Sequence, residues 1–261
     1  MTPKLPIAAI TDEKAGIIKP GIPVVAGVTQ PSAKARIQNR ADLQKSQVFL
    51  KGRDFRCRRI PGRSFTYYGM DHTWSDLKLS LAGFHQVDNA SLVLAVCEIL
   101  QHSDQVRIPL ASIRKGLENS YWPGRLEVVH EAPHLILDGA HNLMAARVLA
   151  RHLNTCYKNR RITLVVGVLD DKPCESILKD LAGPCHRAIV TQPEINRAIP
   201  AEQLAVTARM YFKDVTVVPD VHQAVERALQ DSSPDDVVCV AGSLYVVGEA
   251  KTALRRMGFG P

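Results

Sequence analysis

Polar and flexible residues stand together where an apolar stretch passes into an amphipathic one. The segment "LILDGAHNLMAARVLARHL" (135–153) places Asp138, Gly139, His141 and Asn142 almost side by side. A carboxylate at the carboxyl end of a parallel strand lies at the edge where open α/β sheets bind ligands. The free N–H groups that begin the next helix favour an anion. The pattern predicts a polar cluster that faces a nucleotide or a phosphate.

The same residues also fit a purely structural corner. Asn142 would then cap the helix, Asp138 would make the turn, and His141 would be incidental. Ser243 follows the apolar stretch "VVCVAG" at an expected helix start, where serine is a common N-cap. Lys172, in "GVLDDK", lies past another strand end and is either a site residue or a solvated one. Spacing alone leaves these alternatives open.

Three further segments carry residues with possible chemistry. "EKAGIIK" (13–19) contains Lys14, although an exposed helix end capped by Gly16 also explains it. "FHQVDNA" (84–90) places Asn89 near a helix start, where polar side chains often only cap the helix. "WPGR" (122–125) ends in Arg125, which could hold a phosphate by two parallel hydrogen bonds or pair with a surface acid.

The elements that must position these residues are clearest after residue 125. Apolar runs alternate there with amphipathic segments, which predicts a parallel sheet covered by helices on both faces. An additional edge strand is expected at 125–131. The expected strands are 134–138, 162–169, 187–191, 215–219 and 236–242, and the expected helices are 143–156, 173–182, 200–210, 221–231 and 243–257.

The first half of the chain has a different pattern. Residues 21–28 resemble a buried strand of the parallel type, with no partner strand before it. Short alternating stretches in "SQVFLKG", "DFRCRRI", "SFTYYGMD" and "LKLSLAG" indicate antiparallel strands. Helices are expected at 85–101 and 109–120. The Trp-Pro-Gly break near residue 122 predicts two domains, 1–121 and 122–261.

Composition narrows the class of protein. The 261 residues are 46% hydrophobic, which is ample for a core, and carry a net charge of +7, which favours anionic partners. We do not expect nucleic acid, because dense basic runs are missing and aromatic residues make up only 5%. No CxxC pair occurs among the six cysteines, which predicts reduced thiols. Since no secretory signal or membrane-length apolar run is evident, we expect a soluble cytoplasmic protein.

The order of the motifs is more specific than any one of them. "EKAGIIK", "HQVDNA", "WPGRLEVV", "LILDGAHN", "GVLDDK" and "VAGSLYVVGE" follow one another along nearly the whole chain. This succession resembles the folylpolyglutamate synthase/dihydrofolate synthase family, the folate branch of the Mur ligases. The resemblance implies an α/β fold in two parts. Residues 1–121 would be a remnant of the central ATP-binding domain, and 122–261 a complete Rossmann-like C-terminal domain with a mainly parallel six-stranded sheet.

The resemblance also implies an activity. Family members use ATP and Mg²⁺ to add L-glutamate to dihydropteroate, or to the γ-carboxylate of a folate, through an acyl phosphate. Their partners are these small molecules rather than nucleic acid or membrane, and they are usually monomers. By resemblance, Lys14 is a carbamylated lysine that orders Mg²⁺, and no direct metal ligand is retained. Asn89, Arg125 and Asp138 contact ATP, Arg125 at phosphate and Asp138 at the ribose, while His141 and Ser243 lie near the phosphates or the incoming glutamate.

One family feature is missing from the sequence. The family uses a phosphate loop of the type G-x-x-x-x-G-K-[ST], placed before "EKAGI", and this sequence contains no Gly-Lys pair. We therefore expect a truncated chain that does not ligate glutamate at a useful rate by itself. The alternatives are a non-catalytic fragment, a weak nucleotide-binding module, or a ligase of the cell-wall Mur branch. "DGAHN" and "EKAGI" weigh against the cell-wall branch.

Overall fold

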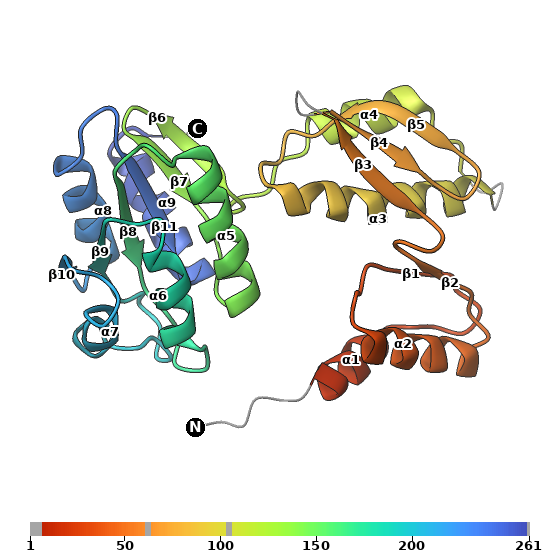
Figure 1. Ribbon diagram of the computed structural model, residues 1–261, viewed down its shortest axis with the longest axis horizontal. Coiled ribbons are helices and arrows are strands. Elements are labelled where there is room, and N and C mark those ends of the chain that lie inside the picture. Colours follow the sequence, from red (N-terminus) through yellow and green to blue (C-terminus); the bar gives the residue numbers. More distant parts are fainter. Residues whose placement is uncertain (1–6, 61–63, 103–105, 260–261) are drawn as a thin grey trace. The chain divides into compact units, whose positions relative to one another are not determined.

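The computed structural model describes residues 7–60, 64–102 and 106–259. The chain forms two compact units, residues 1–121 and 122–261, and each is described here by itself (Figure 1). Two of the cysteines, Cys185 and Cys239, are buried, and all six are free thiols. Burial raises the pKa of the Cys185 thiol to about 12, so this group stays protonated at neutral pH. Within the described ranges, no helix is long and apolar enough to cross a membrane.

The second unit is built on a six-stranded sheet with the order β10-β9-β8-β11-β7-β6. All neighbouring strands are parallel except β6, an edge strand that runs antiparallel to β7. The expected α/β fold with a mainly parallel six-stranded sheet is confirmed. The strands are β6 (Glu127–Glu131), β7 (His134–Leu137), β8 (Ile162–Val166), β9 (Arg187–Val190), β10 (Val215–Val217) and β11 (Val237–Ala241).

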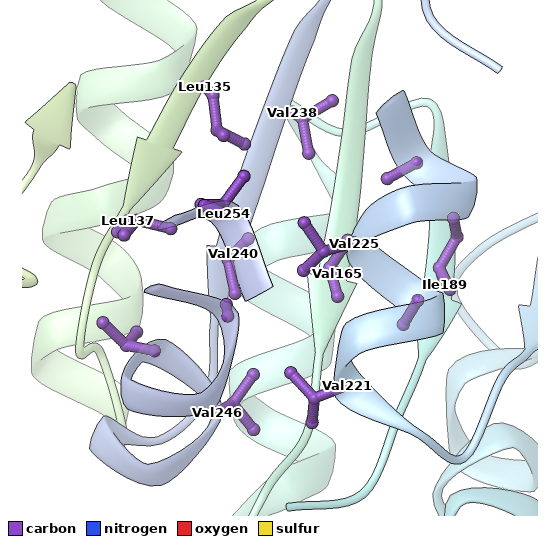
Figure 2. Close-up of a cluster of buried hydrophobic side chains, with 14 residues drawn as sticks. Leu135, Leu137, Val165, Ile189, Val221, Val225, Val238, Val240, Val246 and Leu254 are labelled. Carbon is purple, nitrogen blue, oxygen red and sulfur yellow. The ribbon is translucent and has the colours of Figure 1, made fainter. Parts of the chain in front are cut away.

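From β7 onward, helices and strands alternate strictly, as the apolar periodicity predicted. Two of the helices, α8 and α9, pack on one face of the sheet, where apolar side chains of the strands meet valine, leucine and alanine side chains of the helices (Figure 2). This cluster is almost completely excluded from water and forms the core on this face of the sheet. The helices are α5 (Leu143–Cys156), α6 (Cys174–Ala182), α7 (Ala201–Ala208), α8 (Val221–Gln230) and α9 (Leu244–Arg256).

The first unit contains two small sheets. Strands β1 and β2 pair in parallel, and β3, β4 and β5 form an antiparallel sheet whose apolar side chains pack on α3. A second small cluster lies between β1, β2 and α2. The elements are α1 (Ile7–Ala15), β1 (Val24–Ala26), α2 (Pro31–Leu43), β2 (Val48–Leu50), β3 (Arg56–Ile60), β4 (Ser64–Tyr68), β5 (Thr73–Lys78), α3 (Phe84–His102) and α4 (Leu110–Glu118).

Two expectations for this unit were wrong, and one helix was missed. Strand β2, in "SQVFLKG", runs parallel to β1 rather than joining the antiparallel set. Strand β5 covers 73–78 instead of "LKLSLAG", because a bulge opposite β4 lets both Trp74 and Leu77 reach the core. Helix α2 was not anticipated, since its sequence is polar and buries only Ala33 and Ala41.

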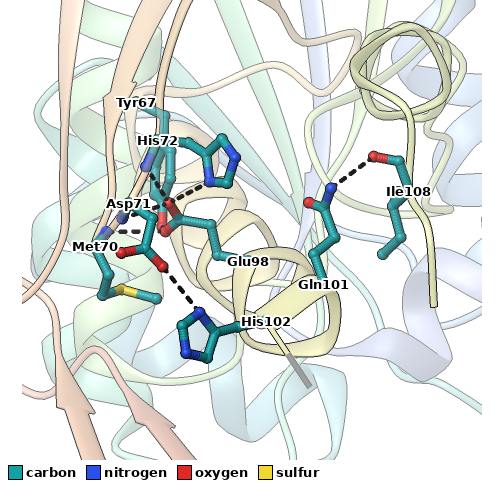
Figure 3. A network of polar contacts seen from close by, with 8 residues as sticks. All are labelled: Tyr67, Met70, Asp71, His72, Glu98, Gln101, His102 and Ile108. Atoms are coloured by element: carbon teal, nitrogen blue, oxygen red, sulfur yellow. Dashed lines mark hydrogen bonds and ion pairs between the residues drawn. The ribbon is translucent and has the colours of Figure 1, made fainter. Parts of the chain in front are cut away.

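A buried carboxylate ties the β4–β5 turn to α3. Glu98 accepts hydrogen bonds from the backbone N–H groups of Met70 (3.0 Å), Asp71 (3.1 Å) and His72 (2.6 Å), and from the Tyr67 hydroxyl (2.7 Å) (Figure 3). The residue is only 2% exposed. A buried charge needs such donors, because it has lost its hydration. Glu98 therefore fixes the shape of this turn.

Candidate functional site at the carboxyl edge of the six-stranded sheet

Three adjacent strands of the sheet end close to glycines. Gly242 directly follows β11 and Gly167 follows β8, while Gly139 lies two residues after the end of β7. Gly242 has a φ of +107°, and a Cβ there would lie 2.4 Å from the Gly167 carbonyl oxygen. Only glycine permits this approach of the two backbones. The strand ends therefore form a tightly packed backbone edge.

Asp138 organises the corner between β7 and α5. Its two carboxylate oxygens accept hydrogen bonds from the backbone N–H groups of Leu126 and Ala140, both at 2.9 Å. The residue is 8% exposed. Burial raises the pKa of Asp138 above its ordinary value, while the two hydrogen bonds and the charges of Arg125 and His141 oppose the rise. The carboxylate thus joins the corner to the segment that precedes β6.

That preceding segment is a turn with an unusual backbone. Gly124 has a φ of +66° and Leu126 a φ of +47°. A leucine in the left-handed region costs on the order of 1–2 kcal/mol, so the surroundings must hold it there. The Gly124 carbonyl accepts a hydrogen bond from the Gly139 N–H (2.7 Å), and the Gly124 N–H donates to Glu127 (2.8 Å). The turn is therefore clamped on both sides of Arg125.

Arg125 lies between these two residues of positive φ and reaches across the corner. A Cβ on Gly139 would lie 2.6 Å from its Nη1 atom, which places the guanidinium directly against the glycine backbone. The side chain is half-buried, and its hydrogen bond to the Gly124 carbonyl is long, at 3.4 Å. Within the described residues, Arg125 forms no ion pair with a carboxylate. Its donors are available to an anion.

His141 and Asn142 complete the corner. The Asn142 side chain accepts a hydrogen bond from the Ala145 N–H at 2.9 Å, so its role as the N-cap of α5 is confirmed. His141 Nδ1 lies 2.8 Å from the Gly139 carbonyl oxygen. A carbonyl oxygen can only accept, so Nδ1 is the donor of this contact; a ring with a single proton therefore carries it on Nδ1 and has its lone pair on Nε2. The half-buried imidazole can therefore accept a proton at Nε2.

Ser243 lies at the same edge, after β11. Its hydroxyl caps α9 by accepting a hydrogen bond from the Val246 N–H at 3.1 Å, and the residue is 1% exposed. The capping interpretation is confirmed, while a contact with glutamate stays a prediction. Lys172 forms an ion pair with Asp171 (2.6 Å), and its side chain is 29% exposed. Among the described residues, its ion pair is with Asp171 rather than with a residue of the Asp138 corner.

The remaining predicted residues belong to the first unit. Lys14 lies in the last turn of α1 with its side chain 75% exposed, and its ammonium pairs with Glu13 at 3.1 Å. Gly16 does not adopt the left-handed conformation of a helix cap. Asn89 lies on α3 and donates to the Gln86 side chain at 2.9 Å. Within the part of the chain that the structure describes, no group of three or more His, Cys, Asp or Glu side chains could hold a metal ion.

Two residues of the corner were missed by sequence reasoning. Glu127 and Lys251 form an ion pair at 2.5 Å, with side chains 5% and 16% exposed. Glu127 lies in "RLEVV", where strand alternation indicated only an edge strand, and Lys251 is one of several basic residues of α9. The two are 124 positions apart in the sequence, so no local pattern joins them.

Comparisons with known proteins match both halves of the chain. Residues 124–244 match the family described as "Mur ligase, glutamate ligase domain". The dihydrofolate synthase/folylpolyglutamate synthase of Bacillus subtilis is 32% identical over 254 residues, which covers 95% of this chain and 58% of that protein. The folylpolyglutamate synthase of Lacticaseibacillus casei is 30% identical over 253 residues, with the same coverage. The chain thus spans a little over half the length of these relatives.

Solved structures agree over nearly the whole chain. Mycobacterium tuberculosis folylpolyglutamate synthase, complexed with ADP and AMPPCP, superposes with a TM-score of 0.85 at 28% identity, over 96% of this chain and 60% of that one. The bifunctional synthase of Yersinia pestis, complexed with AMPPNP and a Mn ion, gives 0.84 at 29% identity, over 97% and 58%. By sequence and by fold, this chain belongs to the folylpolyglutamate synthase/dihydrofolate synthase family of Mur ligases.

Proposed function

We propose that this chain is part of an ATP-dependent ligase that adds L-glutamate to dihydropteroate, to the γ-carboxylate of a folate, or to both. The observation that carries the proposal is the match of 95% of the chain to relatives named as synthases of these two kinds. The nucleotide-bound neighbours support the use of ATP with a divalent cation. Mg²⁺ is the cation that we propose for this chain.

Arg125 is the residue best suited to a phosphate group. A carboxylate is a poor electrophile, and ATP supplies the phosphoryl group that converts it to an acyl phosphate. The guanidinium is half-buried, lacks a carboxylate partner within the described residues, and lies against the Gly139 backbone. Such a group binds phosphate through two parallel charge-assisted hydrogen bonds. Arg125 would neutralise charge on the transferred group without first breaking an ion pair.

Asp138 has two roles in the proposal. It holds the corner through Leu126 and Ala140, and each of its oxygens can accept one more hydrogen bond. A ribose hydroxyl is a suitable donor for that remaining capacity. Because the carboxylate is only 8% exposed, a ribose would have to approach its outer edge.

His141 and Ser243 are assigned to the glutamate side. The free lone pair of His141 Nε2 can take the proton that the glutamate nitrogen loses as it attacks the activated carboxyl. The Ser243 hydroxyl accepts from Val246, which leaves its own proton free to donate to a carboxylate. In both residues a backbone group already holds the side chain: the Gly139 carbonyl contacts His141, and the Val246 N–H donates to Ser243.

Lys14 and Asn89 are assigned to the metal and nucleotide side by the family pattern. Carbamylation would turn the Lys14 ammonium into an anion, so its contact with Glu13 would change from attraction to repulsion. A carbamate at Lys14 therefore needs a cation beside it, which is the role proposed for Mg²⁺. Asn89 would exchange its hydrogen bond with Gln86 for one to ATP.

The test joins this chain to the part of the Bacillus subtilis relative that carries the phosphate loop. We expect the fused enzyme to release ADP only when glutamate and dihydropteroate or a folate are both present. The 261-residue chain alone should release none above background, because phosphoryl transfer depends on the loop and its metal. Arg125→Ala should reduce turnover of the fusion at least a hundredfold. A fusion that folds and binds ATP but forms no glutamyl product would refute the proposed reaction.

A further inference from the structure

The corner contains a buried ion pair between Glu127 and Lys251. Glu127 begins β6, and Lys251 lies two turns into α9. Burying two charges costs free energy that packed apolar residues would not cost. Stability alone therefore does not account for this ion pair. The Glu127 carboxylate also binds the backbone next to Arg125.

The second oxygen of Glu127 holds the turn that carries Arg125. It accepts a hydrogen bond from the Gly124 N–H at 2.8 Å, while the first oxygen binds Lys251. On the other side of Arg125, the Leu126 N–H is held by Asp138. The carboxylates of Glu127 and Asp138 thus accept hydrogen bonds from the residues before and after Arg125. Both of these flanking residues, Gly124 and Leu126, have positive φ angles. Strained backbone that is held this firmly is characteristic of functional sites.

Helix α9 supports the same turn along one stripe of its surface. Leu244, Val247 and Lys251 are spaced three and four residues apart, so they lie on one side of the helix. Their contacts run along the corner. A Cβ on Gly139 would meet Leu244 at 2.4 Å, a Cβ on Gly124 would meet Val247 at 2.9 Å, and Lys251 binds Glu127. The helix therefore forms a rigid backing for the whole turn.

We infer that Glu127 and Lys251 are positioning residues that fix the Arg125 guanidinium for an anionic phosphoryl group. The inference rests on the proposed function for the identity of the anion. Lys251 neutralises Glu127, Glu127 orients the Gly124 peptide, and the oriented peptide aims Arg125 along Gly139. Neither residue touches the anion. Removing the Glu127–Lys251 ion pair should leave the charge of Arg125 unchanged but make its side chain more mobile.

The first measurement follows Arg125 itself in the 261-residue chain. Nitrogen-15 relaxation of the arginine Nε–H groups reports side-chain order, and the exposed Arg151 provides a mobile reference. We expect Arg125 to be ordered in the wild type and to approach Arg151 in Glu127→Gln and in the double variant Glu127→Gln/Lys251→Met. The double variant removes both charges together, which avoids an unpaired buried charge. Arg255→Met, an exposed change on the same helix, should leave Arg125 ordered.

The second measurement titrates the same samples with inorganic pyrophosphate. We expect the Arg125 signal of the wild type to shift, and the dissociation constant to rise about tenfold in the double variant but not in Arg255→Met. An Arg125 as mobile as Arg151 in the wild type, an unshifted Arg125 signal, or unchanged order and affinity in the double variant would each overturn the inference. Ligase activity is read separately in the fused enzyme. A fusion without activity beside an ordered, pyrophosphate-binding Arg125 would refute the proposed reaction and leave the inference standing.

Discussion

At the scale of single residues, buried carboxylates shape both units. Glu98 holds the β4–β5 turn of the first unit, and Asp138 and Glu127 hold the turn around Arg125 in the second. In each case a side chain accepts hydrogen bonds from backbone N–H groups that no strand or helix satisfies. These carboxylates are structural first, and any contact with substrate uses the hydrogen-bonding capacity that they have left.

Replacing Asp138 by asparagine tests its structural role. Asparagine accepts at one atom only, so the N–H of Leu126 or Ala140 loses its partner, at a cost of about 1–3 kcal/mol in the free energy of unfolding. Because the folded pKa of Asp138 is raised above its usual 3.8, its contribution is fullest below that value and declines as the pH rises through the folded pKa. Urea unfolding should therefore show a larger deficit for Asp138→Asn at pH 4 than at pH 7. The exposed change Asp214→Asn should show no such trend, and a deficit that grows with pH would contradict the account.

Glu98→Gln should destabilise the first unit more than any change at an exposed glutamate. The glutamine side chain would turn an NH₂ group toward donors that now meet carboxylate oxygens, leaving at least one buried donor unpaired. We expect a loss of roughly 2–4 kcal/mol in the free energy of unfolding. Glu118→Gln, on the exposed surface of α4, is the matched control. Equal effects of the two changes, measured by thermal unfolding, would show that the Glu98 network contributes little.

At the scale of elements, the two edges of the β1–β2 sheet differ. The outer edge of β2 is closed, because Asp54 accepts from the Leu50 N–H (2.6 Å) and Arg53 donates to the Val48 carbonyl (2.5 Å). Parallel pairing directs the Val24 N–H toward β2, so the peptide groups of Val25 point the other way. Among the described residues, nothing pairs with that side of β1. The open side of this sheet is the β1 edge.

Hydrogen exchange gives a direct test of this asymmetry. The Val25 amide should exchange at least a hundredfold faster than the Leu50 amide, because only the Leu50 N–H is hydrogen-bonded. Asp54→Ala should bring the Leu50 amide toward the Val25 rate, while Asp42→Ala, an exposed change on α2, should not. A Val25 amide as slow as that of Leu50 in the wild type would mean that the β1 edge is covered.

Sequence patterns predicted elements where burial was continuous and failed where it was not. Helix α5 and strands β7 and β11 follow apolar periodicity closely, so the sequence predicted both these elements and the corner between β7 and α5. Helix α2 escaped notice because few of its side chains reach a core. The residues of the site were harder to predict than the elements. Asp138 and Arg125 lie in recognisable motifs, whereas Glu127 and Lys251 are brought together only by the fold.

At the scale of the whole molecule, each unit has its own core. The core of 122–261 includes a large cluster beneath α8 and α9 and further buried leucine and isoleucine side chains of α5 and α6. The described core of the first unit includes two smaller clusters. The free energy of unfolding follows the apolar area that a unit removes from water. The two units should therefore unfold separately, and the first should unfold at lower temperature.

A fragment of residues 122–261 tests this independence. We expect the fragment to fold by itself, with a calorimetric transition within a few degrees of the upper transition of the whole chain, because its sheet and covering helices are complete. The lower transition should be missing. A fragment that shows no cooperative transition would mean that the second unit depends on the first for its stability.

We propose that the turn around Arg125 binds the phosphates of ATP in a folate ligase. A crystal structure of the fused enzyme with a non-hydrolysable ATP analogue and Mg²⁺ tests it most directly. We expect phosphate oxygens within hydrogen-bond distance of the Arg125 guanidinium and the ribose beside Asp138. Phosphates bound elsewhere, with Asn89, Arg125 and Asp138 all turned away from the nucleotide, would contradict it.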